Sequence, residues 1–219
     1  MSPNSPLTDE QRNAVTGLRA MLKTSLSSLP LGTAESVDER ARLPDPENVP
    51  VDVTVRVEIA PPAPLPHPLL ESKVFRTSER VPIYFYALHS NCAQSEPESG
   101  AELANTRVIF FIHAGGNVTG HPADPPFIQF YVQLLRAIAS PSGDAAVGTT
   151  TKCMLIAPSY RLATVPENTF PAALHDLVTA YDYVLGKGYN ASNVIIAGDS
   201  AGGNHGQLRS CPLSIVTWN

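Results

Sequence analysis

Three short apolar runs in the second half of the chain are typical of strands that are covered on both faces. They are Val108–Ile112, Met154–Ala157 and Val194–Ala197. A strand with no polar alternate positions fits a parallel sheet that lies between layers of helices. Helical patterns separate the runs, one opening at Asp124 and one over Phe170–Leu185. Strand, helix, strand, helix, strand predicts an α/β fold in which the three strands are adjacent and parallel.

Both of these helices have a predicted apolar face. On the first it consists of Phe127, Phe130, Tyr131, Leu134, Leu135 and Ile138. On the second it consists of Leu174, Leu177, Val178, Tyr181 and Leu185, with Gly186 suited to the C-terminal cap. Because residues three and four apart share one side of a helix, we expect these faces to pack against the sheet.

The first half of the chain has weaker patterns. Thr8 and Gln11 form a capping box, and the spacing of the following leucines predicts an amphipathic helix over residues 9–28. Alternating valines predict a half-buried strand at 51–59, and a second strand fits Ile83–Leu88. Four stretches are predicted to be irregular: residues 30–50, 61–68, 89–106 and 140–151. We therefore divide the chain into residues 1–50, a helix with a connector, and one domain over residues 51–219.

Composition excludes several classes of protein. The chain has 219 residues, of which 43% are hydrophobic and 16% charged, a balance typical of a folded domain. The net charge is −5 and no basic run occurs, so a nucleic-acid partner is not expected. The sequence has no signal-peptide pattern and no apolar stretch of about 18 residues. Three widely spaced cysteines fit a reducing compartment, so we expect a cytoplasmic protein without a metal site or cofactor.

The segment Gly198-Asp-Ser-Ala-Gly has the pattern of a nucleophile elbow. It follows directly on the apolar run that ends at Ala197. Such a turn exposes the hydroxyl at the end of a strand, and small neighbours let strand and helix approach each other. An ordinary glycine turn is the alternative interpretation. The strand before the segment and a further glycine after it favour Ser200 as a nucleophile.

A second glycine-rich segment, His113-Ala-Gly-Gly, follows the first apolar run. Acyl transfer places negative charge on a carbonyl oxygen, which paired backbone amides can stabilise. Alone, the segment would be read as a turn. Because the carboxyl ends of parallel strands meet at one edge of the sheet, we expect this segment beside the elbow.

Together these motifs resemble the hormone-sensitive-lipase branch of the α/β-hydrolases, the α/β-hydrolase fold-3 family. The resemblance also covers Tyr160-Arg-Leu-Ala, Pro166-Glu and Phe170-Pro-Ala-Ala, and it runs over residues 105–204. It implies a three-layer α/β-hydrolase fold with a mostly parallel sheet, and an N-terminal helix that is part of a cap. It also implies that Ser200 is the catalytic nucleophile, and that Gly115, Gly116 and Ala201 supply the oxyanion-hole amides.

The sequence departs from the family in three places. Ala114 replaces a glycine, and Thr164-Val165 lengthens a loop. After Asn204 the resemblance ends, whereas family members continue with an acid, a histidine and further strands. We expect a fold that is incomplete at its C-terminus, in a truncated or misread gene product that is inactive and unstable as this chain. Structural roles are expected for the remaining candidates: His113, His121, His175, His205, Glu167 and Asp176.

Three classes of function are candidates for this sequence. The first is a carboxylesterase or lipase that cleaves short or medium acyl esters through a Ser200 acyl-enzyme. The second is a non-catalytic homologue that binds a small molecule, because two members of the triad are missing. The third is a chymotrypsin-like protease, whose serine motif is superficially similar. The parallel apolar strands argue against this third class.

Overall fold

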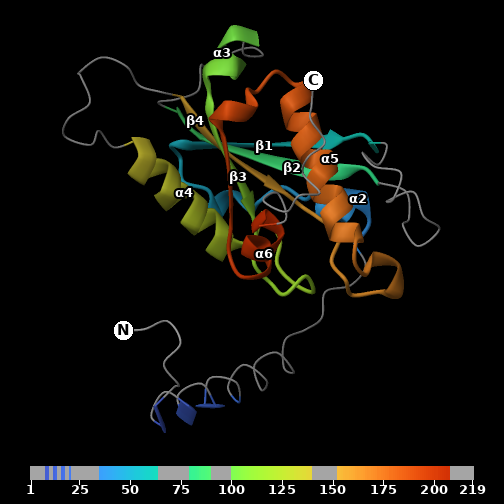
Figure 1. Ribbon diagram of the computed structural model, residues 1–219. Coiled ribbons are helices and arrows are strands. Elements are labelled where there is room, and N and C mark those ends of the chain that lie inside the picture. The colour runs from blue at the N-terminus through green and yellow to red at the C-terminus, as the bar shows by residue number, and fades with distance from the viewer. Residues whose placement is uncertain are drawn as a thin grey trace. The chain divides into compact units, whose positions relative to one another are not determined.

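One five-stranded sheet organises the chain, in the order β1-β2-β4-β3-β5 (Figure 1). The computed structural model describes residues 8, 9, 12, 13, 16, 17, 20, 35–63, 79–89, 100–139 and 152–207. The strands are β1 (Val53–Ala60), β2 (Val81–Leu88), β3 (Arg107–Ile112), β4 (Cys153–Pro158) and β5 (Val194–Gly198). β3 pairs in parallel with both β4 and β5, while β2 is antiparallel to β1 and β4. The predicted trio of adjacent parallel strands is confirmed.

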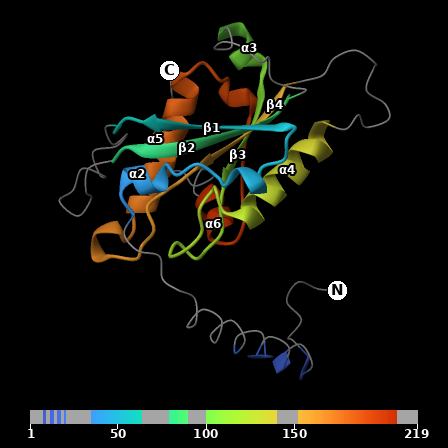
Figure 2. The ribbon, with the colours of Figure 1, turned by 180° about the vertical axis from the view of Figure 1, so that it is seen from behind.

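Two long helices cover opposite faces of this sheet, α4 (Pro125–Ala139) and α5 (Ala172–Gly186) (Figures 1 and 2). The apolar core accordingly falls into two clusters. One joins Leu177 and Val184 of α5 to the sheet, and the other joins Ile128 and Leu135 of α4 to it. The three-layer arrangement that the sequence predicts is confirmed.

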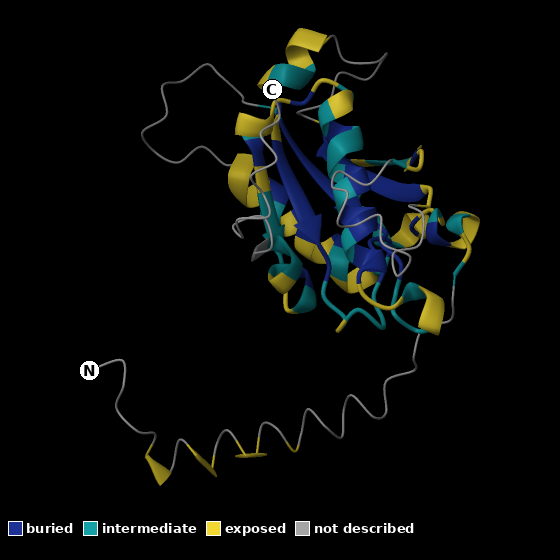
Figure 3. Cartoon of the chain, turned by 45° about the vertical axis from the view of Figure 1, so that its right-hand side comes forward, coloured by how far each residue is buried: buried dark blue, intermediate teal, exposed yellow. Residues whose placement is uncertain are grey.

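The middle strands are buried on both faces, as Figure 3 shows. Every residue of β2 and of β4 is buried. Along β2 the side chains alternate between the two clusters, so that Phe85 lies in the α5 cluster and Tyr84 and Tyr86 lie in the α4 cluster. The edge strand β5 differs from the prediction, since its Ile195 is 66% exposed. Among the described residues β3 is the only strand that pairs with β5, and nothing covers this side chain.

The buried sides of the helices differ from the predicted ones. On α4 the buried residues are Ile128, Tyr131, Val132 and Leu135, whereas Phe130 and Ile138 are exposed. On α5 the buried residues include His175, Asp176 and Thr179, while Leu174 and Val178 are only partly buried. The hydrophobic pattern predicts the wrong buried face for α5, because buried polar side chains occupy part of the face that packs against the sheet.

Two stretches predicted to be irregular contain short helices. Residues 30–50 contain α2 (Val37–Arg40) and η1 (Pro46–Asn48), and residues 89–106 contain α3 (Gly100–Asn105). α2 begins with a capping box, in which the Glu39 amide donates to Ser36 Oγ and the Ser36 amide donates to the Glu39 carboxylate. Residues 61–63 have no regular structure, as predicted. The predictions for 64–68 and 140–151 lie outside the described residues.

The N-terminal part, Met1–Leu31, is a compact unit separate from Gly32–Asn219. Its described residues 9, 12, 13, 16, 17 and 20 are helical, and the Arg12 amide donates to the Thr8 carbonyl at 2.9 Å. The rest of the predicted helix over residues 9–28, with Gln11 of its capping box, lies outside the described residues. The role of residues 1–50 as a cap stays a prediction.

Candidate active site

A sharp turn joins β5 to the helix α6 (Ala201–Gln207), and Ser200 lies in that turn. Its φ angle is +51°, in the left-handed region that residues with a side chain rarely adopt. Ser200 is exposed, and no described residue forms a hydrogen bond with its hydroxyl. The backbone therefore presents the serine oxygen to solvent at the end of the sheet.

The glycines on either side of Ser200 are required by close packing. A Cβ atom on Gly198 would stand 2.5 Å from the Gly202 carbonyl oxygen. A Cβ atom on Gly202 would overlap the carbonyl oxygen of Ile112, on the neighbouring strand β3. Because these contacts involve backbone atoms, no side chain can move aside to make room. The turn thus keeps its shape only with glycine at both positions.

The loop that follows β3 leaves the sheet beside this turn (Figure 1). β3 and β5 stay in register as far as Ile112 and Gly198, and the Asp199 amide donates to the Ile112 carbonyl at 3.3 Å. The loop then passes through Gly115 and Gly116, with φ angles of +124° and +62°. The structure therefore brings together at one edge the two segments that the sequence singles out.

Three backbone amides at this edge have no acceptor in the described part of the chain. They belong to Gly115, Gly116 and Ala201. Ala201 is the first residue of α6, where a helix leaves its amides unpaired. The Gly115 carbonyl accepts from the Val118 and Thr119 amides at 3.0 and 3.1 Å, which closes the glycine loop on itself. The amides are thus available to an oxygen atom at this edge.

His113 is a buried support of the loop. The residue is 1% exposed, and its ring stacks on Tyr160 with ring centroids 4.2 Å apart. Nδ1 lies 2.7 Å from the Ala114 carbonyl oxygen, so this nitrogen carries the proton. The Tyr160 hydroxyl donates to the His113 carbonyl at 2.9 Å. Burial lowers the pKa of His113 to about 4, so the ring is neutral near pH 7.

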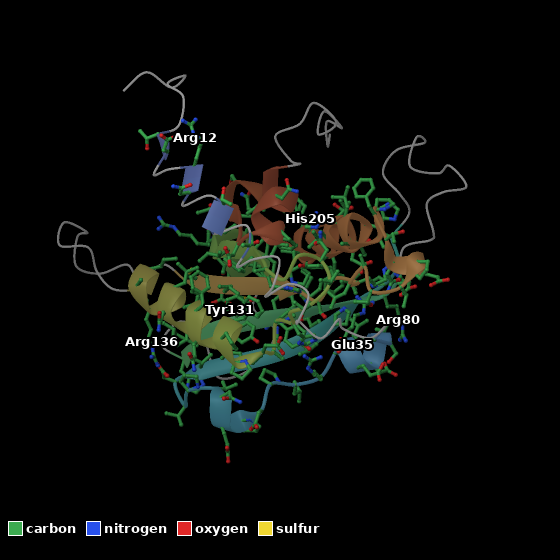
Figure 4. The ribbon with its side chains drawn as sticks, turned by 90° about the horizontal axis from the view of Figure 1, so that it is seen from below. Arg12, Glu35, Arg80, Tyr131, Arg136 and His205 are labelled. Carbon is green, nitrogen blue, oxygen red and sulfur yellow. The ribbon has the colours of Figure 1, made fainter. Side chains whose placement is uncertain are left out.

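Two other histidines nearby are engaged in hydrogen bonds. His205, which Figure 4 labels, lies on α6. Its Nε2 is 2.8 Å from Asn117 Oδ1 in the glycine loop. His121 donates from Nε2 to the Arg40 carbonyl and accepts the Ala123 amide at Nδ1. Burial lowers the pKa of His205, and it lowers that of His121 to about 3. These contacts agree with the structural roles that the sequence predicts for both residues.

The carboxylate of Asp176 is held between two buried arginines. Asp176 is fully buried, and it accepts from the Arg161 amide at 2.8 Å and from Arg161 Nη2 at 2.9 Å. Arg40 Nη1 also donates to it at 3.3 Å. Sequence reasoning missed Arg40 because its partner lies 136 positions further along the chain. Only the Ser36–Glu39 capping box marks the helix that carries it.

A small cavity lies beside the first turn of α5, away from the elbow. Its lining includes Arg161, Glu167, Phe170 and His175. Neither Ser200 nor the glycine loop contributes to this lining. The described residues contain no group of acidic, histidine and cysteine side chains that could hold a metal ion. None of the helices among them is long and apolar enough to cross a membrane.

Comparison with known proteins places these motifs in context. Residues 109–206 match a family model described as "alpha/beta hydrolase fold". An acetyl-hydrolase from Streptomyces hygroscopicus is 35% identical over 96 residues, which are 44% of this chain and 26% of that protein. The solved esterase Est22 has a TM-score of 0.47 at 17% identity, over 92% of this chain and 47% of its own.

Further solved structures resemble the chain in the same way. An esterase from the bacterial hormone-sensitive lipase family has a TM-score of 0.43 at 21% identity, over 94% of this chain and 45% of its own. An esterase from the archaeon Pyrobaculum calidifontis has a TM-score of 0.42 at 20% identity, over 93% and 53%. The chain therefore spans about half the length of these structures, and the match to the acetyl-hydrolase covers about a quarter of that protein.

Proposed function

We propose that Ser200 is the nucleophile of a carboxylic-ester hydrolase of the α/β-hydrolase fold family, whose model matches residues 109–206. The observation that carries the proposal is the exposed Ser200 with a left-handed backbone, between a parallel strand and the first residue of a helix. A strained backbone conformation that the surrounding packing enforces is typical of functional positions. An ordinary glycine turn gives no reason to hold a serine in this conformation.

The proposed reaction proceeds through an acyl-enzyme. Ser200 Oγ attacks the carbonyl carbon of the ester, and the carbonyl oxygen becomes an oxyanion. The Gly115, Gly116 and Ala201 amides donate hydrogen bonds to this oxygen. The alcohol then leaves with a proton, and water attacks the acyl group to release the acid and restore the hydroxyl. The free amides at the two adjoining segments support this assignment.

The Ser200 proton needs a base, and no described residue forms a hydrogen bond with the Ser200 hydroxyl. The hydrogen bonds of His113 and His205 go to Ala114 and Asn117, and burial lowers the pKa of both rings, which weakens them as bases. The candidate acid Asp176 is buried between Arg40 and Arg161. We therefore propose that the 219-residue chain by itself hydrolyses esters only at a residual rate, about 10³–10⁴ over water.

A second candidate function is binding of a small molecule without turnover. The hydrogen bonds of His113 and His205 to other residues favour this function, because the edge of the sheet would then present hydrogen-bond donors without activating Ser200. The two functions differ in what happens to the serine oxygen. A binding protein leaves Ser200 as inert as any exposed serine, whereas a hydrolase elbow makes it react with an electrophile that resembles the acyl transition state.

A fluorophosphonate probe tests the proposal. The 219-residue chain is incubated with excess probe, and the adduct is mapped by peptide mass spectrometry. We expect slow modification at Ser200, and none at the exposed Ser192 on η5 (Ala191–Asn193), which serves as the internal control. Ser200→Ala should abolish the adduct. Equal modification of Ser200 and Ser192, or none at either, would favour the binding function.

A reducing, cytoplasmic location is part of the proposal. It rests on three widely spaced cysteines, of which Cys153 is a buried free thiol on β4. Burial raises the pKa of this thiol, which keeps it protonated and unreactive. Thiol-specific labelling of the protein directly after lysis under native conditions should leave Cys153 unmodified.

A further inference from the structure

We propose that His205 is a positioning residue, which holds the glycine loop in register with α6 through its hydrogen bond to Asn117. This inference rests on the proposed function, because it assigns the hydrogen bond a role in the oxyanion hole. Asn117 and His205 belong to none of the sequence motifs that carry the family resemblance. The proposal follows from the positions of the two segments that supply the amides of the proposed oxyanion hole.

The proposed oxyanion hole is assembled from two separate segments. Gly115 and Gly116 lie in the loop after β3, and Ala201 lies at the start of α6. Donors that act together on one oxygen must be held within about 0.5 Å of the productive geometry. Contacts before the loop fix the end of β3 against the elbow, as the Asp199–Ile112 hydrogen bond shows. The loop itself needs a separate attachment to α6.

The hydrogen bond between His205 and Asn117 supplies that attachment. Asn117 follows Gly116 directly, and His205 lies four residues after Ala201 on α6. Nε2 and Oδ1 are 2.8 Å apart. The described residues contain no other side-chain hydrogen bond between α6 and residues 113–120. This hydrogen bond thus joins the loop to the helix one residue after Gly116 and about one helical turn after Ala201.

The surroundings fix both partners of this hydrogen bond. Asn117 has a φ of +64°, a left-handed conformation that asparagine tolerates better than most residues. Its carbonyl oxygen accepts from the Ala163 amide at 2.6 Å. The His205 ring meets the Tyr160 ring edge to face, with centroids 6.0 Å apart. Tyr160 in turn supports His113 at the start of the loop, so the histidine and the loop share one anchor.

The protonation state of His205 suits a fixed donor. Its Nδ1 is buried and has no hydrogen-bond partner among the described residues. Burial lowers its pKa, so the ring is neutral near pH 7. Since Asn117 Oδ1 is an acceptor, the proton of the neutral ring lies on Nε2. The ring therefore presents one tautomer, and the direction of the hydrogen bond does not change across neutral pH.

The test compares His205→Leu, which removes the donor, with His205→Gln, whose amide nitrogen can replace Nε2. Asn117→Gly removes the acceptor and tolerates the positive φ. Asn204→Ala is the matched control, an exposed position on the same helix. Hydrogen exchange of the amides in 115–119 is measured by mass spectrometry, with β3 as the internal reference. The rate of fluorophosphonate modification at Ser200 is measured on the same proteins.

We expect His205→Leu to speed exchange in 115–119 by about fivefold to tenfold, the effect of losing one hydrogen bond. It should slow modification of Ser200 by a similar factor, and His205→Gln should restore both rates. In the Asn117→Gly background, His205→Leu should add nothing, because the pair is already broken. If His205→Leu does not fold, His205→Gln and Asn117→Gly give the same comparison.

Three results would overturn the inference. They are unchanged exchange in His205→Leu, an equal change in Asn204→Ala, and faster exchange with an unchanged rate at Ser200. Absence of any adduct in the parent chain would count against the proposed function instead. In that case the exchange rates and their non-additivity in the double variant still decide whether His205 holds the loop.

Discussion

The Cα atom of Gly202 lies so close to the carbonyl oxygen of Ile112 that a Cβ atom on this glycine would overlap the oxygen. Gly202 belongs to α6 and Ile112 ends β3, so the contact joins the helix after the elbow to the strand before the glycine loop. The two halves of the proposed oxyanion hole are therefore brought together by backbone packing. This packing can be tested separately from any chemistry.

Gly202→Ala should destabilise the fold, because neither of the two backbone segments in contact can move aside. Overpacking of a well-packed site costs about 1–3 kcal/mol, and a clash with backbone belongs at the upper end. Gly206→Ala is the control on the same helix, since its Cβ would stand 3.5 Å from Ile196 Cγ2, an ordinary contact. Urea denaturation should separate the two variants clearly. Equal free energies of unfolding would contradict the observed packing.

Ser200→Gly should be more stable than Ser200→Ala. Both variants lose the hydroxyl, but only glycine relieves the left-handed conformation at φ +51°. We expect a difference of roughly 0.5–1 kcal/mol, after allowing for the larger backbone entropy of glycine in the unfolded chain. Denaturant midpoints of the two variants measure it. A less stable glycine variant would mean that the turn does not hold Ser200 in this conformation.

The pH dependence of stability should reflect the buried histidines His113 and His121. Burial lowers their folded-state pKa values to about 4 and about 3, below the unfolded value of 6.5. The unfolded chain therefore binds protons first, so this contribution is complete above pH 6.5 and is lost as the pH falls towards 4 and 3. NMR titration of the imidazole carbon protons gives the two values directly. A midpoint near 6.5 for either ring would contradict its burial.

Asp176→Asn should be strongly destabilising, because it removes the buried carboxylate that Arg40 and Arg161 share and leaves them only the half-exposed Glu79 as an acidic partner. Breaking such a buried cluster costs about 3–5 kcal/mol. Asp182→Asn on the same helix is the control. Asp182 is only partly buried and forms no ion pair with the described residues, so its replacement should change the free energy of unfolding little. The melting temperature at pH 7 should thus fall clearly for Asp176→Asn and stay near that of the parent for Asp182→Asn.

The sequence predicted the centre of the sheet and the elbow because both depend on local patterns. The apolar runs at Val108–Ile112 and Met154–Ala157 are long enough to identify buried strands without any knowledge of their neighbours. The glycines around Ser200 mark a tight turn for a steric reason that a single segment already contains. The catalytic roles of Ser200, Gly115, Gly116 and Ala201 stay predictions.

The errors arose where distant residues decide the structure. Asp176 lies on the buried side of α5 because Arg40 compensates its charge from a position near the other end of the chain. Residues 100–105 form α3 although their polar composition predicts a loop. The contact between His205 and Asn117 could not be predicted, since it joins a helix to a loop 88 positions earlier in the chain. No local pattern records such pairs.

A crystal structure of the fluorophosphonate adduct would show directly whether Ser200 is the nucleophile of this site. The proposed function predicts phosphorus bonded to Ser200 Oγ, with its phosphoryl oxygen about 2.7–3.1 Å from the amides of the oxyanion hole. Those amides are Gly115, Gly116 and Ala201, which have no acceptor in the described part of the chain. An adduct on another serine, or a phosphoryl oxygen that faces solvent away from the glycine loop, would contradict the proposed function.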